Sequence, residues 1–371
     1  MIIHQRKILV LFYLYFAAIH DCGTGQCKYE RPKLGVENNF ANMLVRLNNN
    51  RRAGTSGPRE GRVEVSFDFG DTWGTICSSK WSFREGNVVC RQLKLGYATM
   101  ANQTTQYGTS TDHPWKMVGT LCRGNEKSLA NCTRESRYPE TVCTSNNSNV
   151  ATVRCVERSP DLSLGLREIE TSVRLEAVPM SRIACAMEEN CVSRDAYEIR
   201  RTQPHAVRLL LRFTTKAENV GTADLSPYAN YDRWQWHQCH NHYHSMEVFA
   251  TFDIYNMQYR KMAEGHKASF CLMDTMCVPG VQPRYTCGNV TQGISVGCSD
   301  LYTAGLDCQW VDVTNLPRNQ QYILRVALNP QYQIGEISFE NNGVECILHY
   351  TGNSATTRIT RCSPAGLWFR I

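Results

Sequence analysis

Runs of apolar and polar residues along this chain of 371 residues predict mostly strands. The segment Arg62–Phe67 alternates, with Val63, Val65 and Phe67 on one face, which is typical of a half-buried strand. Other segments alternate or are continuously apolar over the length of a strand. They are Gly74–Cys77, Val207–Phe213, Glu247–Tyr255, Tyr322–Leu328 and Val344–Tyr350. We therefore expect a mainly β protein.

One short helix is predicted among the first of these strands. Ser82-Phe-Arg-Glu85 is a capping-box sequence, and Gly96 is a suitable residue to end the helix. Apolar residues lie between them at Val88, Val89, Leu93 and Leu95. The N-terminal domain should therefore be a small α+β unit with one helix packed on strands.

The N-terminus carries a different pattern. An uninterrupted apolar run, Ile8–Ile19, follows the charged residues Arg6 and Lys7. This arrangement indicates a secretory signal peptide, which we place at residues 1–20. A buried core helix is the alternative. No later segment is apolar for long enough to span a bilayer, so we expect a secreted protein without a membrane span in its mature form.

Composition supports a secreted protein of two domains. The chain has 18 cysteines, which indicates an oxidising compartment and several disulfides. No cysteine lies between 156 and 184, so we place one domain at 43–156 and a second, sandwich-like and loop-rich, at 160–371. The net charge of +6 indicates no nucleic-acid partner. Glycan acceptor motifs occur at Asn102, Asn131, Asn146 and Asn289.

The motifs of the first domain are specific to one family. "GRVEVSFDFGDTWGTIC", "WSFREGNVVCRQLKLG" and "LCRGNEKSLANC" closely resemble a scavenger receptor cysteine-rich domain. The resemblance implies a disulfide-rich binding module, although a spacer or folding aid is an alternative. It also implies three disulfides, Cys77–Cys143, Cys90–Cys155 and Cys122–Cys132, which spacing alone does not select from the 15 pairings of six cysteines.

A histidine cluster, "WQWHQCHNHYHSM" at 234–246, marks a candidate metal site in the second domain. His240, His242 and His244 are spaced by two, so on one extended strand they share a face, whereas His237 lies on the other and is given a structural role. Imidazole ligands suit copper or zinc, and spacing does not choose between them. A merely polar or pH-sensitive strand is the alternative. The chain lacks the His-Glu-x-x-His motif of many zinc hydrolases.

The same stretch closely resembles the copper-binding signature of the lysyl oxidase family. The likeness continues through "GHKASFCLMDTMC", "GCSDLY", "DCQWVDVTNLP", "YILRVALNP" and "FENNGVEC", in the family's order. It implies copper ligation by His240, His242 and His244, and a lysine tyrosylquinone cofactor built from Lys267 and Tyr302. The family pairing also implies five disulfides: Cys185–Cys239, Cys191–Cys308, Cys271–Cys287, Cys277–Cys298 and Cys346–Cys362.

Two further expectations concern the surroundings of this site. The resemblance implies a calcium site formed by Asp161, the Leu162 carbonyl, Glu336, Asn341 and Asn342, where oxygen ligands suit a hard cation. Ser338 departs from the family there, because the relatives carry an acidic side chain. Asp253 and Asp274 are candidates for the base that removes a substrate proton, although each has a structural alternative.

The function that the resemblance implies is oxidation of protein-bound lysine. A copper-dependent protein-lysine 6-oxidase converts peptidyl-lysine to allysine with O₂ and releases NH₃ and H₂O₂, which leads to crosslinking of extracellular matrix proteins such as collagen and elastin. Zinc in place of copper in unprocessed protein is an alternative, since histidine ligands accept both. Two other functions stay open: a matrix-binding protein with an idle oxidase domain, and an oxidase of small free amines.

Overall fold

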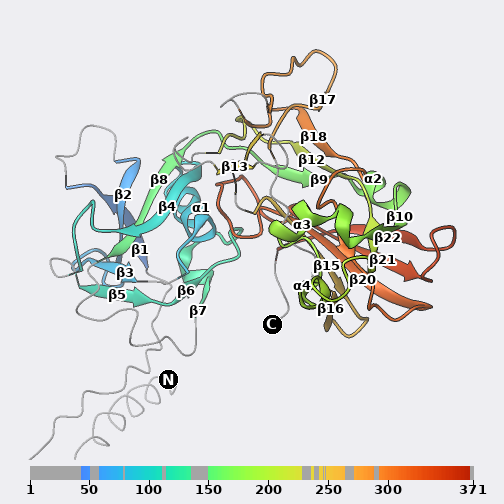
Figure 1. Cartoon of the computed structure of the whole chain (residues 1–371). Coiled ribbons are helices and arrows are strands. Elements are labelled where there is room, and N and C mark those ends of the chain that lie inside the picture. The colour runs from blue at the N-terminus through green and yellow to red at the C-terminus, as the bar shows by residue number, and fades with distance from the viewer. Residues whose placement is uncertain are drawn as a thin grey trace, which may run out of the picture. The chain divides into compact units, whose positions relative to one another are not determined.

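Strands dominate the described chain, and only short helices accompany them (Figure 1). The structure, a computed structural model, describes residues 43–50, 58–77, 80–110, 114–134, 149–227, 235–237, 242–244, 246, 248–263, 271–287 and 292–367. The signal peptide at 1–20, His240 and Lys267 lie outside the described residues. The expectation of a mainly β protein is confirmed.

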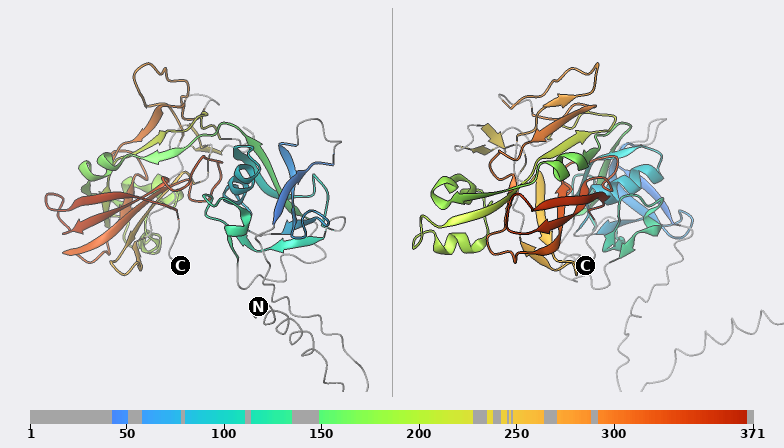
Figure 2. Two further views of the ribbon diagram at one scale, coloured as in Figure 1. Left: turned by 180° about the vertical axis from the view of Figure 1, so that it is seen from behind. Right: turned by 90° about the vertical axis from the view of Figure 1, so that its right-hand side faces the viewer.

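The first domain is one sheet with a helix packed on it. Its strands run in the order β4-β8-β2-β3-β5, with β1 also paired to β2. All described pairs are antiparallel except β3 with β5. Helix α1 packs on β4 and β8, as Figure 2 shows. The elements are β1 (Leu44–Asn48), β2 (Glu60–Ser66), β3 (Gly74–Cys77), α1 (Phe83–Gln92), β4 (Tyr97–Thr104), β5 (Trp115–Val118) and β8 (Val150–Val156).

Strand β2 corrects one expectation, because it is buried on both faces. Val63 and Val65 are fully buried in the core, as expected. The opposite face is also covered, with Arg62 only 1% exposed and Glu64 fully buried. The two side chains form an ion pair of 2.6 Å between Arg62 Nε and Glu64 Oε1. Arg62 also donates to Asn50 and the Tyr107 carbonyl, and Glu64 accepts from Arg46 and Asn48, so these groups cover a face that alternation alone would place in solvent.

Helix α1 begins as expected and ends earlier than expected. Ser82 and Glu85 form the predicted capping box. At the other end Lys94, with φ 58°, takes the left-handed position, and the amides of Lys94 and Leu95 bond to the carbonyls of Arg91 and Cys90. This is a Schellman motif built on lysine. The expectation that Gly96 ends the helix is therefore wrong, because Lys94, two residues earlier, takes that position.

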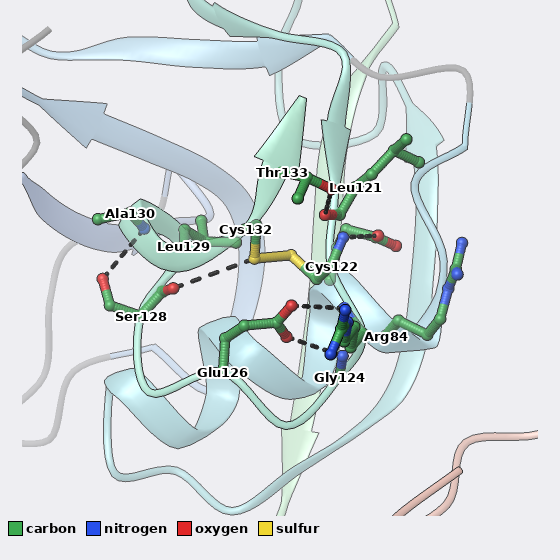
Figure 3. The surroundings of a disulfide bond; sticks show 12 residues. Arg84, Leu121, Cys122, Gly124, Glu126, Ser128, Leu129, Ala130, Cys132 and Thr133 are labelled. Atoms are coloured by element: carbon green, nitrogen blue, oxygen red, sulfur yellow. Dashed lines mark hydrogen bonds between the residues drawn. A yellow bond between two sulfur atoms is a disulfide. The ribbon is translucent and has the colours of Figure 1, made fainter. Parts of the chain in front are cut away.

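The loop between Cys122 and Cys132 is tied at its base by their disulfide (Figure 3). Inside it, the Glu126 carboxylate accepts the backbone N–H groups of Arg123 and Gly124 at 2.6 and 2.9 Å. The loop contains η2 (Leu129–Asn131) and lies between the short paired strands β6 (Thr120–Leu121) and β7 (Thr133–Arg134). Because both cysteines are oxidised, neither offers a thiolate to a metal.

The second domain is built from several small sheets. A five-stranded sheet has the order β16-β15-β20-β21-β22, a four-stranded sheet the order β17-β18-β12-β9, and a three-stranded sheet the order β10-β11-β19. Strands β20, β21 and β22 lie side by side in Figures 1 and 2. The strands are β9 (Leu162–Leu164), β10 (Arg174–Pro179), β11 (Val207–Arg212), β12 (Thr215–Asn219), β15 (Ala250–Tyr255), β16 (Lys261–Ala263), β17 (Met276–Cys277), β18 (Cys298–Tyr302), β19 (Trp310–Asp312), β20 (Gln320–Leu328), β21 (Gly343–Tyr350) and β22 (Arg358–Ala365).

One hydrophobic core joins these sheets. It takes Phe252, Leu324 and Leu348 from the five-stranded sheet, and Ala217 and Tyr302 from the four-stranded sheet. This is the sandwich-like arrangement that was expected. Helix α2 (Leu166–Thr171) contributes Ile169 to this core. The short helices η3 (Met180–Arg182), α3 (Ala184–Glu188) and α4 (Arg194–Ile199) pack in a separate hydrophobic cluster with Leu210 and Trp310. None of the helices in the described ranges is long and apolar enough to cross a membrane.

Disulfides hold the loops, and six of the implied pairs are confirmed. They are Cys90–Cys155, Cys122–Cys132, Cys191–Cys308, Cys271–Cys287, Cys277–Cys298 and Cys346–Cys362. Cys77 and Cys185 are also disulfide-bonded. Their expected partners, Cys143 and Cys239, lie outside the described residues.

Candidate active site

The histidine cluster is a hairpin and not one continuous strand. Its two strands are β13 (Gln235–His237) and β14 (His242–His244), which pair antiparallel. The register sets His237 directly opposite His242 and Gln235 opposite His244. Directly opposed residues of an antiparallel pair occupy the same face. The single extended strand that the spacing argument assumed is therefore not present across His237 and His242, and the role of His237 stays a prediction.

Tyr302 ends strand β18 inside the core of the second domain. Its side chain is 4% exposed, and its ring centroid lies 5.8 Å from that of Phe249. Phe249 follows the histidine hairpin closely in sequence, so the chain leaving β14 passes beside Tyr302. Tyr302 Oη donates a hydrogen bond of 2.7 Å to Asp300 Oδ2.

Asp300 is a buried carboxyl that the sequence analysis did not single out. It is 2% exposed, and burial raises its pKa to about 6 against the opposing effect of its hydrogen-bond donors. Burial, and then the neighbouring Asp300 carboxyl, raise the pKa of the Tyr302 phenol well above its usual value. The phenol therefore keeps its proton and donates it in a hydrogen bond to the Asp300 carboxylate.

The segment that follows Lys267 converges on the same carboxyl. The backbone N–H of Met273 donates to Asp300 Oδ2 at 2.9 Å, and Thr275 Oγ1 donates to Oδ1 at 2.9 Å. The disulfides Cys271–Cys287 and Cys277–Cys298 fix this segment, the second of them directly to β18. Lys267 itself lies outside the described residues, so its distance from Tyr302 is not part of the structure.

The two residues predicted as the base, Asp274 and Asp253, bind other groups of the second domain. Asp274 accepts the backbone N–H groups of Arg284, Tyr285 and Ser295, and these donors outweigh burial and keep its pKa below the usual value. Asp253 pairs with Lys261 Nζ at 3.0 Å. Asp300 contacts Tyr302 directly, so it is a further candidate proton acceptor beside Asp253 and Asp274.

A second cluster gathers the residues expected to bind calcium. Glu336 is fully buried, and its carboxylate accepts the Leu162 N–H at 2.6 Å and the Asn342 amide at 2.7 Å. Asp161 accepts the Ser338 N–H at 3.2 Å and also interacts with the Asn341 side chain. Five residues distant in sequence are thereby brought together on the loops beside β9 and β21.

Unsatisfied oxygens make this cluster suitable for a hard cation. Among the described residues, the side-chain oxygens of Asn341 and Asn342 are buried without a hydrogen-bond partner. Burial raises the pKa of Glu336 to about 8, and the nearby Asp161 carboxyl adds to the effect. Two carboxyls and two orphaned amide oxygens fit calcium, which prefers oxygen ligands and offsets the repulsion between the carboxylates.

This cluster also touches the first domain. The Asn87 side chain on α1 donates to the Glu336 carbonyl at 2.7 Å, and its own oxygen accepts the Ala98 N–H at 2.8 Å. Asn87 is 1% exposed. Its amide therefore joins the helix of the scavenger receptor-like unit to the loop that carries Glu336.

Comparisons with known proteins match two families to two separate parts of the chain. The lysyl oxidase family profile matches residues 160–362, and that of the scavenger receptor cysteine-rich domain matches residues 53–156. Lysyl oxidase homolog 4 of Homo sapiens is 40% identical over 351 residues, which is 91% of this chain and 45% of that protein. Lysyl oxidase homolog 2 of Mus musculus is 43% identical over 336 residues, or 88% of this chain and 42% of that protein.

This chain matches only part of the length of each relative. This chain spans less than half the length of these curated relatives. Among solved structures, the third scavenger receptor domain of murine neurotrypsin is 34% identical and covers 30% of this chain and 95% of that one, with a TM-score of 0.24. Disulfide-rich scavenger receptor and lysyl oxidase domains together indicate an extracellular protein. On the extent of the profile match and of the identity to these relatives, the chain belongs to the lysyl oxidase family.

Proposed function

We propose that this protein is a secreted, copper- and quinone-dependent amine oxidase that acts on lysine side chains of extracellular matrix proteins such as collagen. It would convert peptidyl-lysine to allysine with O₂ and release NH₃ and H₂O₂. The proposed copper ligands are His240, His242 and His244, and the proposed cofactor is a lysine tyrosylquinone from Lys267 and Tyr302. When present, copper and quinone supply oxygen chemistry and a reversible two-electron acceptor, which ordinary side chains lack.

One observation carries this proposal. In a member of the lysyl oxidase family, the chain that follows Lys267 and the strand that holds Tyr302 meet at a single buried carboxyl, Asp300. A quinone built from two residues needs their segments to be held together before it forms. The disulfides and the shared carboxyl provide this support without involving either reacting side chain.

The roles of the chain's own residues follow from their contacts. The core around Tyr302 excludes water from its ring, and Phe249 fixes one side of it. Asp300 Oδ2 orients the phenol and is placed to receive its proton. Because His237 lies opposite His242, it is proposed as a residue that supports the ligands from the neighbouring strand.

The direct test combines chemistry with activity. Copper-loaded full-length protein should release H₂O₂ from a lysine-rich collagen substrate, and mass spectrometry of native protein should find a peptide that crosslinks Lys267 to Tyr302. Metal analysis should find copper, whereas zinc would indicate unprocessed or misloaded protein. H₂O₂ release without the crosslinked peptide would overturn the cofactor assignment, and absence of both would favour a matrix-binding protein with an idle oxidase domain.

Asp300→Asn is expected to slow quinone formation by roughly 100-fold, the lower end of the usual effect of losing an acid–base group. Asparagine keeps the size of the side chain but cannot take the Tyr302 proton. Since the pKa of Asp300 is about 6, formation in the wild type should rise with pH through about 6 as the carboxylate becomes available. The measurement is the yield of crosslinked peptide against time and pH after copper addition.

The matched control for this change is Asp253→Asn, which alters a carboxylate paired with Lys261 and not with Tyr302. It should keep the wild-type rate and pH profile. A wild-type rate and an unchanged pH profile in Asp300→Asn would remove Asp300 from the assignment.

An oxidase of small free amines is the second candidate function. Oxidases of protein-bound lysine and of small amines differ in the shape of the active site, since a protein substrate needs an open site and a small amine can enter a closed pocket. Competition between a lysine-containing peptide and a free alkylamine of equal length distinguishes them. Preference for the free amine would replace the matrix substrate in this proposal.

We also propose that Asp161, the Leu162 carbonyl, Glu336, Asn341 and Asn342 hold a calcium ion. The support is the pair of orphaned amide oxygens beside two carboxyls. Ser338 offers a hydroxyl where relatives carry an acid, so the site has one charge fewer and should bind calcium more weakly.

A further inference from the structure

A cleft on the outer face of the five-stranded sheet, lined by polar side chains together with Met257 and Ile347, has no role in the proposed oxidase chemistry. Two adjoining hollows, each of about 400 Å³, share Gln321, His349 and Arg358 as lining residues. We call this feature the Arg358 cleft, and it also includes Asn319, Thr360 and Arg361. We propose that the Arg358 cleft binds a sulfated oligosaccharide of the glycosaminoglycan type.

A β-bulge brings the second arginine into the cleft. Opposite the single residue Cys346 of β21, strand β22 has two residues, Arg361 and Cys362. Cys362 takes the inward position and forms the disulfide with Cys346. Arg361 is the extra residue, with φ 55°, and its side chain is exposed. Without the bulge, alternation would turn Arg361 toward the core, so the bulge places it beside Arg358 on the outer face.

The charge of the cleft is positive and unbalanced. Within the described residues, no ion pair or hydrogen bond engages the guanidinium of Arg358 or of Arg361, and no acidic side chain lines either hollow. The nearby acids are occupied elsewhere: Glu345 pairs with Arg325 at 3.3 Å, and Glu170 accepts the Cys362 N–H at 2.7 Å. Two exposed cations without counter-ions favour an anionic partner.

The rest of the lining favours a sugar over a peptide. The Gln321 amide and the Thr360 hydroxyl contact the His349 ring, at 3.4 Å from Nδ1 and 3.0 Å from Nε2. Their remaining capacity and the Asn319 amide supply donors and acceptors that match the hydroxyl groups of a carbohydrate. Guanidinium groups bind planar or tetrahedral oxyanions through paired N–H donors, which matches sulfate esters. The two hollows share lining residues and are partly open, so a short oligosaccharide can lie across both.

The test uses the full-length protein and a heparin octasaccharide as the probe, with affinity measured by calorimetry near physiological ionic strength. The double variant Arg358→Gln/Arg361→Gln should weaken binding by about tenfold or more, because it removes two charge-assisted contacts. It should also lower the slope of log Kd against log salt by about two, one for each lost cation. Glutamine retains most of the side-chain length, so the sheet should unfold at an unchanged temperature.

The matched control is Arg200→Gln/Arg201→Gln, which removes the same charge from exposed positions after α4. Its affinity should stay within about twofold of the wild type. An equal loss of affinity in both double variants would show that only net charge matters and would overturn the proposal. Unchanged affinity in Arg358→Gln/Arg361→Gln would also overturn it. Tighter, Arg358-dependent binding of a hexaglutamate peptide than of the octasaccharide would replace the sugar with an acidic peptide. Neither outcome depends on oxidase activity.

Discussion

Replacing Tyr302 with phenylalanine is expected to reduce amine oxidation by at least about 1,000-fold, to the background rate, because a ring without its oxygen cannot become a quinone. The fold should survive, since phenylalanine fills the same space in the core beside Phe249. The cost is the hydrogen bond to Asp300, about 1 kcal/mol, because Asp300 keeps its bonds from Met273 and Thr275. H₂O₂ release and thermal unfolding measure the two effects separately.

Tyr322→Phe is the matched control for this prediction. Tyr322 is equally buried, and its hydroxyl donates to the Pro317 carbonyl at 2.8 Å. The change removes the same atom from the same core, so it should cost similar stability and leave oxidation intact. If Tyr302→Phe retained activity while folded, Tyr302 would not be a cofactor precursor. If Tyr322→Phe also lost activity, the loss would be attributable to the core and not to the cofactor.

The sequence predicts the strands of the core well because burial dominates there. The expected strands at 207–213, 322–328 and 344–350 correspond to β11, β20 and β21, whose inward residues are almost fully buried. Six disulfides also agree with the family pairing. The errors occur where tertiary contacts change a local preference: Glu64 is covered by neighbouring strands, and Lys94 takes a position that glycine usually fills.

The candidate site shows both the value and the limit of spacing arguments. Period-two spacing correctly suggested an extended conformation for His242 and His244, but it could not show the reversal of chain that sets His237 opposite His242. The same period-two spacing also relates Asp300 to Tyr302, and the sequence analysis did not use it. Two residues apart on a strand, they share a face, and the structure joins them by a hydrogen bond. The role of Asp300 was therefore accessible from "CSDLY" once β18 was recognised as a strand.

In the absence of calcium, the free energy of unfolding is expected to fall as the pH rises, because Glu336 loses its proton. In the cation-free protein its pKa is raised from 4.5 to about 8 by burial, so the folded state holds a proton that the unfolded chain releases near pH 4.5. The contribution of this proton to the free energy of unfolding is complete below about pH 4.5 and is lost as the pH rises to about 8, a change of roughly 5 kcal/mol. Bound calcium stabilises the ionised carboxylate, so it should cancel most of this loss, and saturation at a hundredfold excess over Kd adds about 3 kcal/mol.

Urea unfolding between pH 5 and 8, in EDTA and in calcium, measures this linkage. Glu336→Gln should be insensitive to both pH and calcium relative to the wild type, since glutamine does not ionise and the free oxygens of Asn341 and Asn342 can accept its N–H. Glu345→Gln, which changes a partly exposed acid paired with Arg325, should keep the wild-type response. Because Asp300 and other groups titrate in both proteins, the difference between wild type and Glu336→Gln isolates the effect. A calcium response of equal size in Glu336→Gln would contradict the assignment of Glu336 as a ligand. In EDTA, the raised pKa would be contradicted if the free energy of unfolding of the wild type increased relative to that of Glu336→Gln as the pH rises.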